Sequence, residues 1–345
     1  MDFNGHIPRT HEGIDEWIAD PTPGVLETLG RTSGDFMVIG VGGKMGASTA
    51  LMLKRGLKET GQKARVYGVS RFSDPAARER LESYGVETVS ADVLEAEAVN
   101  QLPDARNILF LVGQKFGTAG NPEATWATNA VAPAFVCERF RNSRIVALST
   151  GCVYPFVPVE SGGATEETPM GPSGDYANSC VGRERVFAYY AGKYRLPTAL
   201  VRLNYAIDPR YGVLLDIGMK VAAGEPVAVD TGWVNYIWQG DAVARSIQCF
   251  DHVSSPPFVI NITGPETMAV RMIAARFGEL LGRKPVLSGT ESPTAWLSNA
   301  SLSMKLFGQP RYNAEELIRI VAEHIRQDGV TLGKPTHFEA RSGQF

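Results

Sequence analysis

The residues whose types and spacing most directly indicate chemistry form a glycine-rich stretch, Ile39-Gly40-Val41-Gly42-Gly43-Lys44-Met45-Gly46. Glycine permits a tight turn and lets backbone N–H groups approach a pyrophosphate, and the N-terminus of a following helix adds partial positive charge. No Gly-Lys-Ser/Thr sequence follows, so the stretch is not a P-loop. A turn of this kind can also be geometry alone, but its position predicts a dinucleotide site made by Gly40, Gly43, Lys44, Met45 and Gly46.

Residues at the ends of the next two expected strands indicate which dinucleotide is bound. About 20 residues after the glycines, an acidic side chain would hold both ribose hydroxyls and repel a 2′-phosphate. Ser70 and Arg71 stand there instead and offer a hydroxyl and a guanidinium. This predicts NADP(H), with NAD as the alternative if Arg71 is only a solvated charge or stacks on adenine. Asp92, followed by Val93, ends the third strand, where its carboxylate can accept from the adenine amino group.

The elements that must position these residues alternate through the N-terminal third. Short apolar stretches rich in β-branched residues predict strands at 36–39, 64–69, 88–89, 108–112 and 145–148. Between the first two, a helix over 47–60 places Ala50, Leu53 and Leu57 on one face. Strands that alternate with helices imply right-handed crossovers, so we expect an α/β fold with a Rossmann-like, doubly wound parallel sheet.

The second half of the chain is less regular. We expect a helix near 179–193 and a strand at 198–203, then strand-like segments at 227–229, 236–238 and 258–262 and helices near 216–223, 241–250, 270–281 and 314–327. Asn313 and Glu316 have the spacing of a capping box for the last helix. We therefore divide the chain into an N-terminal extension (1–33), a Rossmann domain (34–206), a smaller mixed α/β substrate-binding region (207–330) interleaved with returning Rossmann elements, and a tail (331–345). The extension and the tail are expected to lie over the surface.

Composition argues against several classes of protein. The chain has 34 Lys and Arg against 37 Asp and Glu, and its net charge of −3 gives no electrostatic reason to expect nucleic acid or an anionic membrane as partner. No export signal or membrane-spanning apolar run is present, and the scattered histidines predict no metal site. Four cysteines without CxxC spacing predict free thiols in the cytoplasm: Cys137, Cys152, Cys180 and Cys249.

Taken together, these features resemble the extended short-chain dehydrogenase/reductases, the NAD(P)-dependent epimerase/dehydratases of nucleotide-sugar type, over about Asp35 to Gln327. Gly40, Gly43 and Gly46 match the family's Gly-x-x-Gly-x-x-Gly turn. The sequence Leu-Ser-Thr-Gly-Cys-Val-Tyr at 148–154 matches its Ser-Ser-x-x-Val-Tyr-Gly segment, and Asp-Tyr-Ala-Asn-Ser at 175–179 matches the start of its Tyr-x-x-x-Lys helix. The segment 261–270 resembles the family's entry to a C-terminal helix.

The resemblance implies an NAD(P)-dependent oxidoreductase or epimerase that acts by hydride transfer on a small hydroxylated substrate, and it implies a homodimer. Tyr176 would be the acid/base, and Thr150 would hold and polarise the substrate oxygen. Lys115, after the fourth strand, would approach the cofactor, and Asn129 falls where the family has an asparagine on the next helix. Oxidation or reduction, epimerisation and dehydration are not separated by the sequence.

One departure from the family is chemically important, because Cys180 stands where the lysine of Tyr-x-x-x-Lys belongs. A phenol that titrates near 10 in water needs a nearby positive charge to act at neutral pH. Lys115 is our first choice for that charge, with Arg183 and the positive nicotinamide of an oxidised cofactor as alternatives. Cys180 itself is expected to be a packing residue. The departure also motivates a second hypothesis, a non-catalytic NADP(H)-sensing or scaffold protein of the same fold.

The substrate residues differ from those of the nucleotide-sugar members. Val234 stands where those members carry an arginine for the substrate diphosphate, which argues against a nucleotide sugar. We expect instead a non-nucleotide sugar or sugar acid, held by Thr150, Arg202, Asn204, Tyr205 and Trp238, with the tryptophan ring against the C–H face of the sugar. Arg210 and Asn235 are further candidates.

Overall fold

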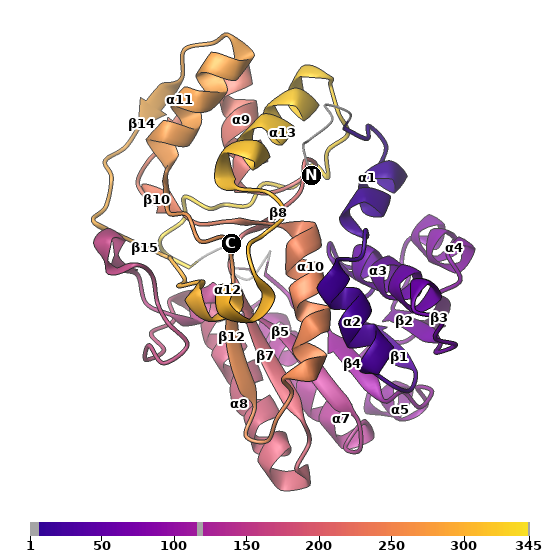
Figure 1. The fold of residues 1–345 in the computed structure, drawn as a ribbon. Helices are drawn as coiled ribbons and strands as arrows, with labels where there is room; N and C mark the ends of the chain where they lie inside the picture. The colour runs from indigo at the N-terminus through magenta and orange to yellow at the C-terminus, as the bar shows by residue number, and fades with distance from the viewer. Residues whose placement is uncertain (1–6, 116–119, 344–345) are drawn as a thin grey trace.

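A seven-stranded parallel sheet forms the centre of the computed structural model, which describes residues 7–115 and 120–343 (Figure 1). Positions 1–6 of the extension and 344–345 of the tail lie outside the described residues. The spatial order of the strands is β12-β7-β5-β4-β1-β2-β3. Their bounds are β1 (Phe36–Ile39), β2 (Val66–Ser70), β3 (Glu87–Ser90), β4 (Asn107–Phe110), β5 (Arg144–Thr150), β7 (Thr198–Leu203) and β12 (Phe258–Ile262). The predicted Rossmann-like fold is confirmed.

The order of the strands reverses between β1 and β4, since β1 pairs with β2 on one side and with β4 on the other. In sheets of this class, ligands bind outside the carboxyl ends of the strands at such a switch point. The glycine-rich stretch leaves β1 at this point. The topology therefore places the predicted dinucleotide site at this switch point, outside the carboxyl ends of the strands.

Helices cover both faces of the sheet. One face packs against α2 (Pro23–Arg31), α3 (Gly46–Glu59) and α10 (Gln239–Gln248), and the other against α5 (Ala96–Asn100), α7 (Ala132–Arg139) and α8 (Gly174–Tyr194). Ala50, Leu53 and Leu57 of α3 are buried, as their spacing predicts. The helices α4 (Pro75–Ser83) and α6 (Pro122–Trp126) complete this half, and a π-helical turn (Ala127–Val131) joins α6 to α7.

A second core lies at the carboxyl ends of the strands, where Figure 1 shows α9 (Val213–Ala223), α11 (Val270–Leu281) and α13 (Ala314–Arg326) grouped together. The predicted capping box of α13 is present. Between these helices run α12 (Ser301–Phe307) and short two-stranded pairs. The strands of these pairs are β6 (Val157–Pro158), β8 (Ala206–Ile207), β9 (Pro226–Ala228), β10 (Trp233–Val234), β11 (Ile237–Trp238), β13 (Met268–Ala269), β14 (Val286–Ser288) and β15 (Thr294–Ala295).

The expectation that the extension and the tail lie over the surface is wrong. The extension forms α1 (His11–Ile18) and α2, and Ile14, Ile18 and Leu29 on these helices are fully buried. The Thr10 and Thr22 side chains accept hydrogen bonds from backbone N–H groups as N-caps. Both helices therefore begin after a residue type that favours the start of a helix. In the tail, Phe338 is 1% exposed and packs in the second core.

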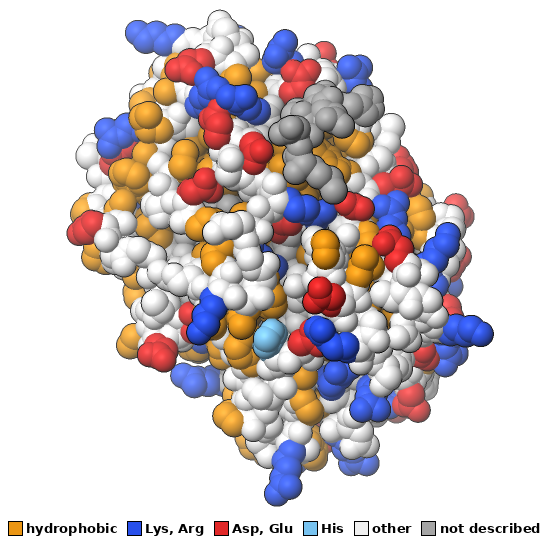
Figure 2. Space-filling model, in the orientation of Figure 1, with side chains coloured by type: hydrophobic (Ala, Val, Ile, Leu, Met, Phe, Trp, Pro, Cys, Tyr) orange, Lys and Arg blue, Asp and Glu red, His pale blue; other side chains and the backbone are white. Residues whose placement is uncertain are grey.

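The surface carries no single dominant charge. Figure 2 shows lysine and arginine side chains interspersed with aspartate and glutamate over one face of the molecule. Among the described helices, none combines the length and the apolar character that a membrane crossing requires.

Candidate active site

The glycine-rich turn follows β1 as two successive tight turns, in which Gly43 N–H donates to Gly40 O and Gly46 N–H donates to Gly43 O, each at 3.0 Å. Gly40 has φ +95°, and a Cβ there would lie 2.9 Å from the backbone nitrogen of Val112. A Cβ on Gly46 would lie 2.3 Å from Val41 O. The chain itself therefore requires glycine at both positions.

The turn ends in a helix terminus suited to an anion. No side chain caps α3, and the backbone N–H groups of Lys44 and Met45 donate to no other described residue. Unsatisfied N–H groups at the positive end of a helix attract phosphate. The end of β2 lies against the same turn, because a Cβ on Gly42 would meet the Ser70 hydroxyl oxygen at 2.6 Å. These residues fit the pyrophosphate and adenosine ribose of a dinucleotide.

The other residues predicted for the adenosine end lie at the ends of β2 and β3. The Arg71 side chain is 77% exposed, and its Nη1 lies 3.8 Å from Asp92 Oδ2. Asp92 Oδ1 accepts from Leu94 N–H at 3.0 Å, which holds that carboxylate beside the guanidinium. Val93 points the other way and packs in the core under the sheet, so it contributes backbone at most.

A cavity of about 180 Å³ opens beyond the turn, at the carboxyl ends of β5 and β7. It brings together seven of the predicted site residues: Lys44, Met45, Lys115, Thr150, Tyr176, Asn204 and Tyr205. A larger hollow of about 380 Å³ is lined by residues that precede strands, among them Asp35, Arg106 and Ser143. It lies at the amino ends of the strands, where parallel sheets do not bind ligands, so we assign the site to the smaller cavity.

Tyr176 and Thr150 meet in this cavity. Tyr176 lies in the first turn of α8 and Thr150 ends β5; both line the cavity, and hydrogen bonding with the Thr150 side chain acts to lower the pKa of the Tyr176 phenol. Burial raises the pKa of the Tyr176 phenol well above its ordinary value, and the neighbouring thiols of Cys180 and Cys152 add to this effect. The phenol therefore stays protonated at neutral pH and is a proton donor unless a cation intervenes.

Arg183 supplies a cation on the same helix. Its guanidinium is buried, donates to Leu148 O at 2.8 Å, and lowers the pKa of Tyr176 against the effect of burial. Gly113 leaves room for it, since a Cβ there would lie 2.8 Å from Arg183 Nη2. Lys115, our first choice, lines the cavity, but its Nζ donates to Thr336 O in the tail at 3.3 Å. Arg183 is thus the stronger candidate to replace the missing lysine.

The Asn129 side chain is fully hydrogen-bonded within the protein. Its oxygen accepts from Gln114 N–H at 3.0 Å and from Arg183 Nη2 at 2.6 Å. Its nitrogen donates to Gln114 O at 3.1 Å and to Ser179 Oγ at 2.9 Å. Both lone pairs and both N–H groups are occupied, so the predicted cofactor contact is replaced by support for Arg183 and for the segment after β4.

Two predicted substrate residues lie away from the cavity. Arg202 is paired with Glu184 at 2.8 Å and donates to the Tyr154 hydroxyl at 2.7 Å, within a buried network. Trp238 is fully buried, with its ring 4.7 Å from that of Trp17. The prediction that these two side chains contact the substrate is therefore wrong. The Arg202 side chain lies in a buried polar network, and the Trp238 side chain lies in the second core.

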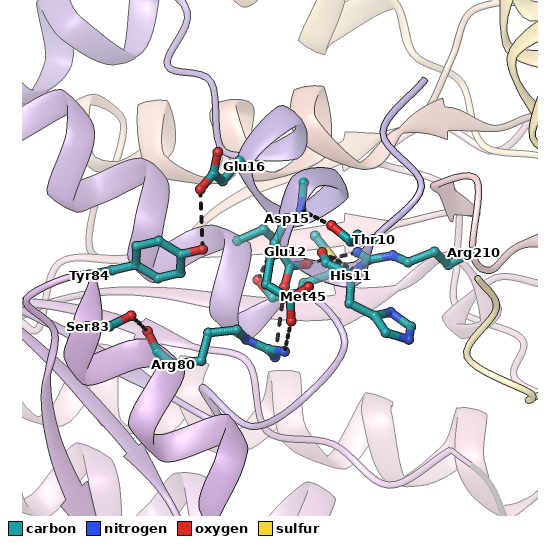
Figure 3. A network of polar contacts seen from close by, with 12 residues as sticks. Thr10, His11, Glu12, Asp15, Glu16, Met45, Arg80, Ser83, Tyr84 and Arg210 are labelled. Atoms are coloured by element: carbon teal, nitrogen blue, oxygen red, sulfur yellow. Dashed lines mark hydrogen bonds and ion pairs between the residues drawn. The ribbon is translucent and has the colours of Figure 1, made fainter. Parts of the chain in front are cut away.

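The further candidates Arg210 and Asn235 are also engaged within the protein. Arg210 Nη2 donates to Asp15 at 2.9 Å, and Asp208 holds the same guanidinium. Figure 3 shows Asp15, on α1, with Arg80 on one side and Arg210 on the other, so the extension links the cofactor half to the loop before α9. Asn235 accepts from Asn204 Nδ2 at 2.7 Å and thereby orients a side chain that does line the cavity.

Sequence reasoning missed part of the cavity wall. Cys152, Tyr211 and Thr336 line it, and Thr336 comes from the tail, where Asp216 Oδ2 accepts from its backbone N–H at 2.8 Å. Cys152 lies two residues after Thr150, so its nearness could have been read from the motif. Nothing in the sequence near Thr336 indicates a site. Tyr205 has φ +43°, an uncommon value that marks a constrained loop at the cavity.

Comparisons with known proteins agree with this geometry. The model of the NAD dependent epimerase/dehydratase family matches residues 36–262. A search of curated proteins found no significant match. Among solved structures, UDP-glucose 4-epimerase of Thermus thermophilus in complex with NAD is similar, with a TM-score of 0.69 at 19% identity over 85% of this chain and 99% of that chain.

A second similar structure is UDP-glucuronic acid 4-epimerase of Bacillus cereus in complex with UDP-glucuronic acid and NAD, with a TM-score of 0.70 at 16% identity over 85% of this chain and 99% of that chain. Identities this low establish the fold and not the substrate. The family match covers the glycine turn, Thr150 and Tyr176, which the structure assembles around one cavity. On this evidence the chain belongs to the NAD dependent epimerase/dehydratase family.

Proposed function

We propose that the protein is an NAD(P)-dependent oxidoreductase or epimerase that acts by hydride transfer on a small hydroxylated compound, a non-nucleotide sugar or sugar acid. The observation that carries the proposal is that Thr150 and Tyr176 line one cavity next to the uncapped glycine turn. A hydroxyl and a phenol beside the cofactor site are the groups that manage the proton at a carbinol or carbonyl oxygen during hydride transfer.

In the proposed mechanism both side chains act on the reacting oxygen of the substrate: one holds the oxygen, and the other exchanges a proton with it. A bound nicotinamide cofactor would supply or accept the hydride. Thr150 would hold the reacting oxygen, and Tyr176 would give it a proton when a carbonyl is reduced or take one when a carbinol is oxidised. The oxidative direction needs a phenolate, so the opposing effect of Arg183 on the pKa of Tyr176 matters most there.

We propose NADP(H) as the preferred cofactor, with NAD as the alternative. Support comes from Ser70 beside the turn and from Arg71, whose guanidinium is exposed at the end of β2 and available to a 2′-phosphate. Asp92 weakens the argument in part, since its carboxylate lies 3.8 Å from Arg71. Competitive binding of NADPH and NADH, followed by fluorescence, decides between the two.

Three observations support a substrate without a nucleotide. The cavity that Thr150 and Tyr176 line is small, about 180 Å³, which favours a substrate of monosaccharide size over one that carries a nucleotide diphosphate. Arg202 and Arg210, the two arginines that the sequence suggests for substrate binding, are both paired with carboxylates. Val234, in the place of the family's arginine, is fully buried.

The test is a screen for a change in nicotinamide absorbance, with sugar acids, polyols and aldoses offered together with NADP+ or NAD+. Turnover by the native protein should be lost in Tyr176→Phe, while NADPH binding remains. A matched control is Tyr189→Phe, which alters an exposed phenol on the same helix. Undiminished turnover in Tyr176→Phe would refute the assigned role.

The second hypothesis is a non-catalytic protein that binds NADP(H), and the observation behind it is Cys180 in the place of the family's lysine. The two hypotheses differ in one result of the same screen. Saturable NADPH binding without a redox change for any hydroxylated compound would favour the sensor or scaffold.

We also propose a homodimer in the cytoplasm. Exposed apolar side chains occur on three mutually packed elements, Trp126 on α6, Val131 on the π-helical turn and Tyr189 on α8. All four cysteines are free thiols, as a reducing compartment favours. Light scattering on the purified protein and fractionation of cells test these two points.

A further inference from the structure

Lys44 and Lys115 both reach from the cofactor half of the molecule to the opposite wall of the cavity. Lys44 Nζ donates to Ala206 O in β8 at 2.8 Å and lies 4.1 Å from the centre of the Tyr211 ring. Lys115 Nζ donates to Thr336 O in the tail at 3.3 Å. Two ammonium groups from different loops therefore converge on one small space.

Among the described residues, no aspartate or glutamate forms an ion pair with the Lys44 ammonium within 4.0 Å. One of its three N–H groups is used on a carbonyl, and Asp208 and Asp216 act on its charge from a greater distance. Burial lowers the pKa of Lys44 to about 8 against the attraction of Asp208 and Asp216, and the charges of Arg210 and Lys115 act in the same direction as burial. A buried cation in this state gains strongly from an anion.

The neighbouring carboxylates are already engaged. Asp208 pairs with Arg210, and Asp216 Oδ2 accepts from the backbone N–H and the hydroxyl of Thr336. The phenols of Tyr205 and Tyr211 face the same cavity, and burial raises the pKa of each, so they stay neutral. Asp208 and Asp216 therefore attract the Lys44 ammonium through their charge, but neither forms an ion pair with it.

We infer that Lys44 and Lys115 form an anion-binding subsite that takes the carboxylate of the substrate, so that the enzyme acts on a small sugar acid. This inference rests on the proposed function, because it assumes that the cavity receives the substrate. Lys44 belongs to the glycine turn, but its ammonium points to β8 and Tyr211 on the far wall. The cofactor pyrophosphate has the backbone N–H groups of the same turn, which leaves the ammonium for the substrate.

The experiment measures binding to the protein saturated with NADP+, by calorimetry, for matched acids and neutral compounds: D-glucuronate with D-glucose, D-galacturonate with D-galactose, and D-gluconate with sorbitol. At least one acid should bind about tenfold or more tightly than its neutral partner, because charge-assisted hydrogen bonds have roughly twice the strength of neutral ones. Lys44→Met should abolish this preference and Lys44→Arg should retain it. Lys58→Met, on the exposed side of α3, is the control.

Each alternative outcome is informative. An acid preference that survives in Lys44→Met, or the binding of neutral compounds only, or of none of the six, overturns the inference. A weaker NADP+ affinity in Lys44→Met with the acid preference intact assigns the ammonium to the pyrophosphate and also overturns it. An acid that binds through Lys44 without ever changing the redox state of the nicotinamide refutes the proposed oxidoreductase while leaving the anion subsite in place.

Discussion

Arg183 Nη2 donates to Asn129 Oδ1 at 2.6 Å, and this bond holds a buried guanidinium one turn beyond the position where the family has its lysine. Lysine at position 180 would place its charge directly behind the phenol, whereas Cys180 is neutral and burial raises its pKa to about 11. The helix therefore carries a buried positive charge three residues beyond Cys180, and Asn129 on the π-helical turn holds it in place. Irregular turns of this kind occur often at functional sites.

Replacing Arg183 should change the pH dependence of the reaction. Arg183 lowers the pKa of Tyr176, so Arg183→Met raises that pKa further. For substrate oxidation, which needs the phenolate, the rise of kcat/KM with pH should move to higher pH, with a loss of about tenfold or more at pH 7. Arg183→Lys should shift the profile less. An unchanged profile in a folded Arg183→Met protein would exclude Arg183 as the positioning residue.

Cys180 is expected to be inert. Its side chain is fully buried in a small cluster with Val153 and Tyr154, and its raised pKa leaves it a thiol at neutral pH. Cys180→Ala should therefore keep kcat within about threefold and should lower the free energy of unfolding by roughly 1 kcal/mol, through the small cavity it leaves. Steady-state kinetics and urea denaturation measure both quantities. Loss of all turnover would instead indicate that the thiol takes part in the chemistry.

The features that the sequence predicted best are those that depend only on residues close together in the chain. The bounds of β1, β7 and β12 were predicted to the residue, because short apolar runs between polar residues define buried parallel strands. The glycine turn and the pairing of Thr150 with Tyr176 also follow from short motifs, since the ends of β5 and α8 come together in any fold of this topology. These parts of the site needed no knowledge of distant contacts.

The rest depends on contacts between residues far apart in the chain. Thr336 lies at the cavity, where it is bonded to Asp216, and Phe338 anchors the same part of the tail in the second core. Trp17, in the extension that was expected to lie over the surface, packs against the buried Trp238. Arg202 has the sequence position of a substrate-binding residue, but in the fold it is paired with Glu184. In each case a partner residue far away in the chain determines where the side chain lies, and no local pattern in the sequence indicates that partner.

Lys44→Met should stabilise the protein at neutral pH. The pKa of Lys44 falls from 10.5 in the unfolded chain to about 8 in the folded one. Below about pH 8 both states are protonated and the unfavourable burial of the charge is fully present; between about 8 and 10.5 the unfolded chain binds more protons, so the stability of the native protein rises with pH. The variant should gain at most about 3 kcal/mol at pH 7, less where solvent reaches the ammonium.

Urea denaturation at pH 7 and at pH 10 measures this difference. The advantage of Lys44→Met should shrink toward zero at the higher pH, while Lys58→Met should match the native protein at both. Equal stabilities of Lys44→Met and the native protein at pH 7 would mean that the ammonium is well solvated, and the argument for an anion subsite would lose its electrostatic basis.

The choice of cofactor should respond to Arg71 and Asp92 in opposite directions. Arg71→Ala removes the guanidinium expected to face the 2′-phosphate, so NADPH should bind about fivefold more weakly, a modest effect (~1 kcal/mol) because the side chain is exposed. Affinity for NADH, which has no 2′-phosphate, should not change. Asp92→Asn frees Arg71 from its neighbouring carboxylate and should raise the affinity for NADPH relative to NADH by a few fold, since any loss at the adenine amino group is common to both cofactors.

Salt provides an independent check on this assignment. Binding of NADPH to the native protein should weaken more steeply with ionic strength than binding of NADH, because an exposed arginine and a phosphate attract each other through solvent. In Arg71→Ala the two cofactors should show the same salt dependence. If the variant retains the steeper dependence for NADPH, the 2′-phosphate meets another cation, and the preference read from Ser70 and Arg71 has been assigned to the wrong residues.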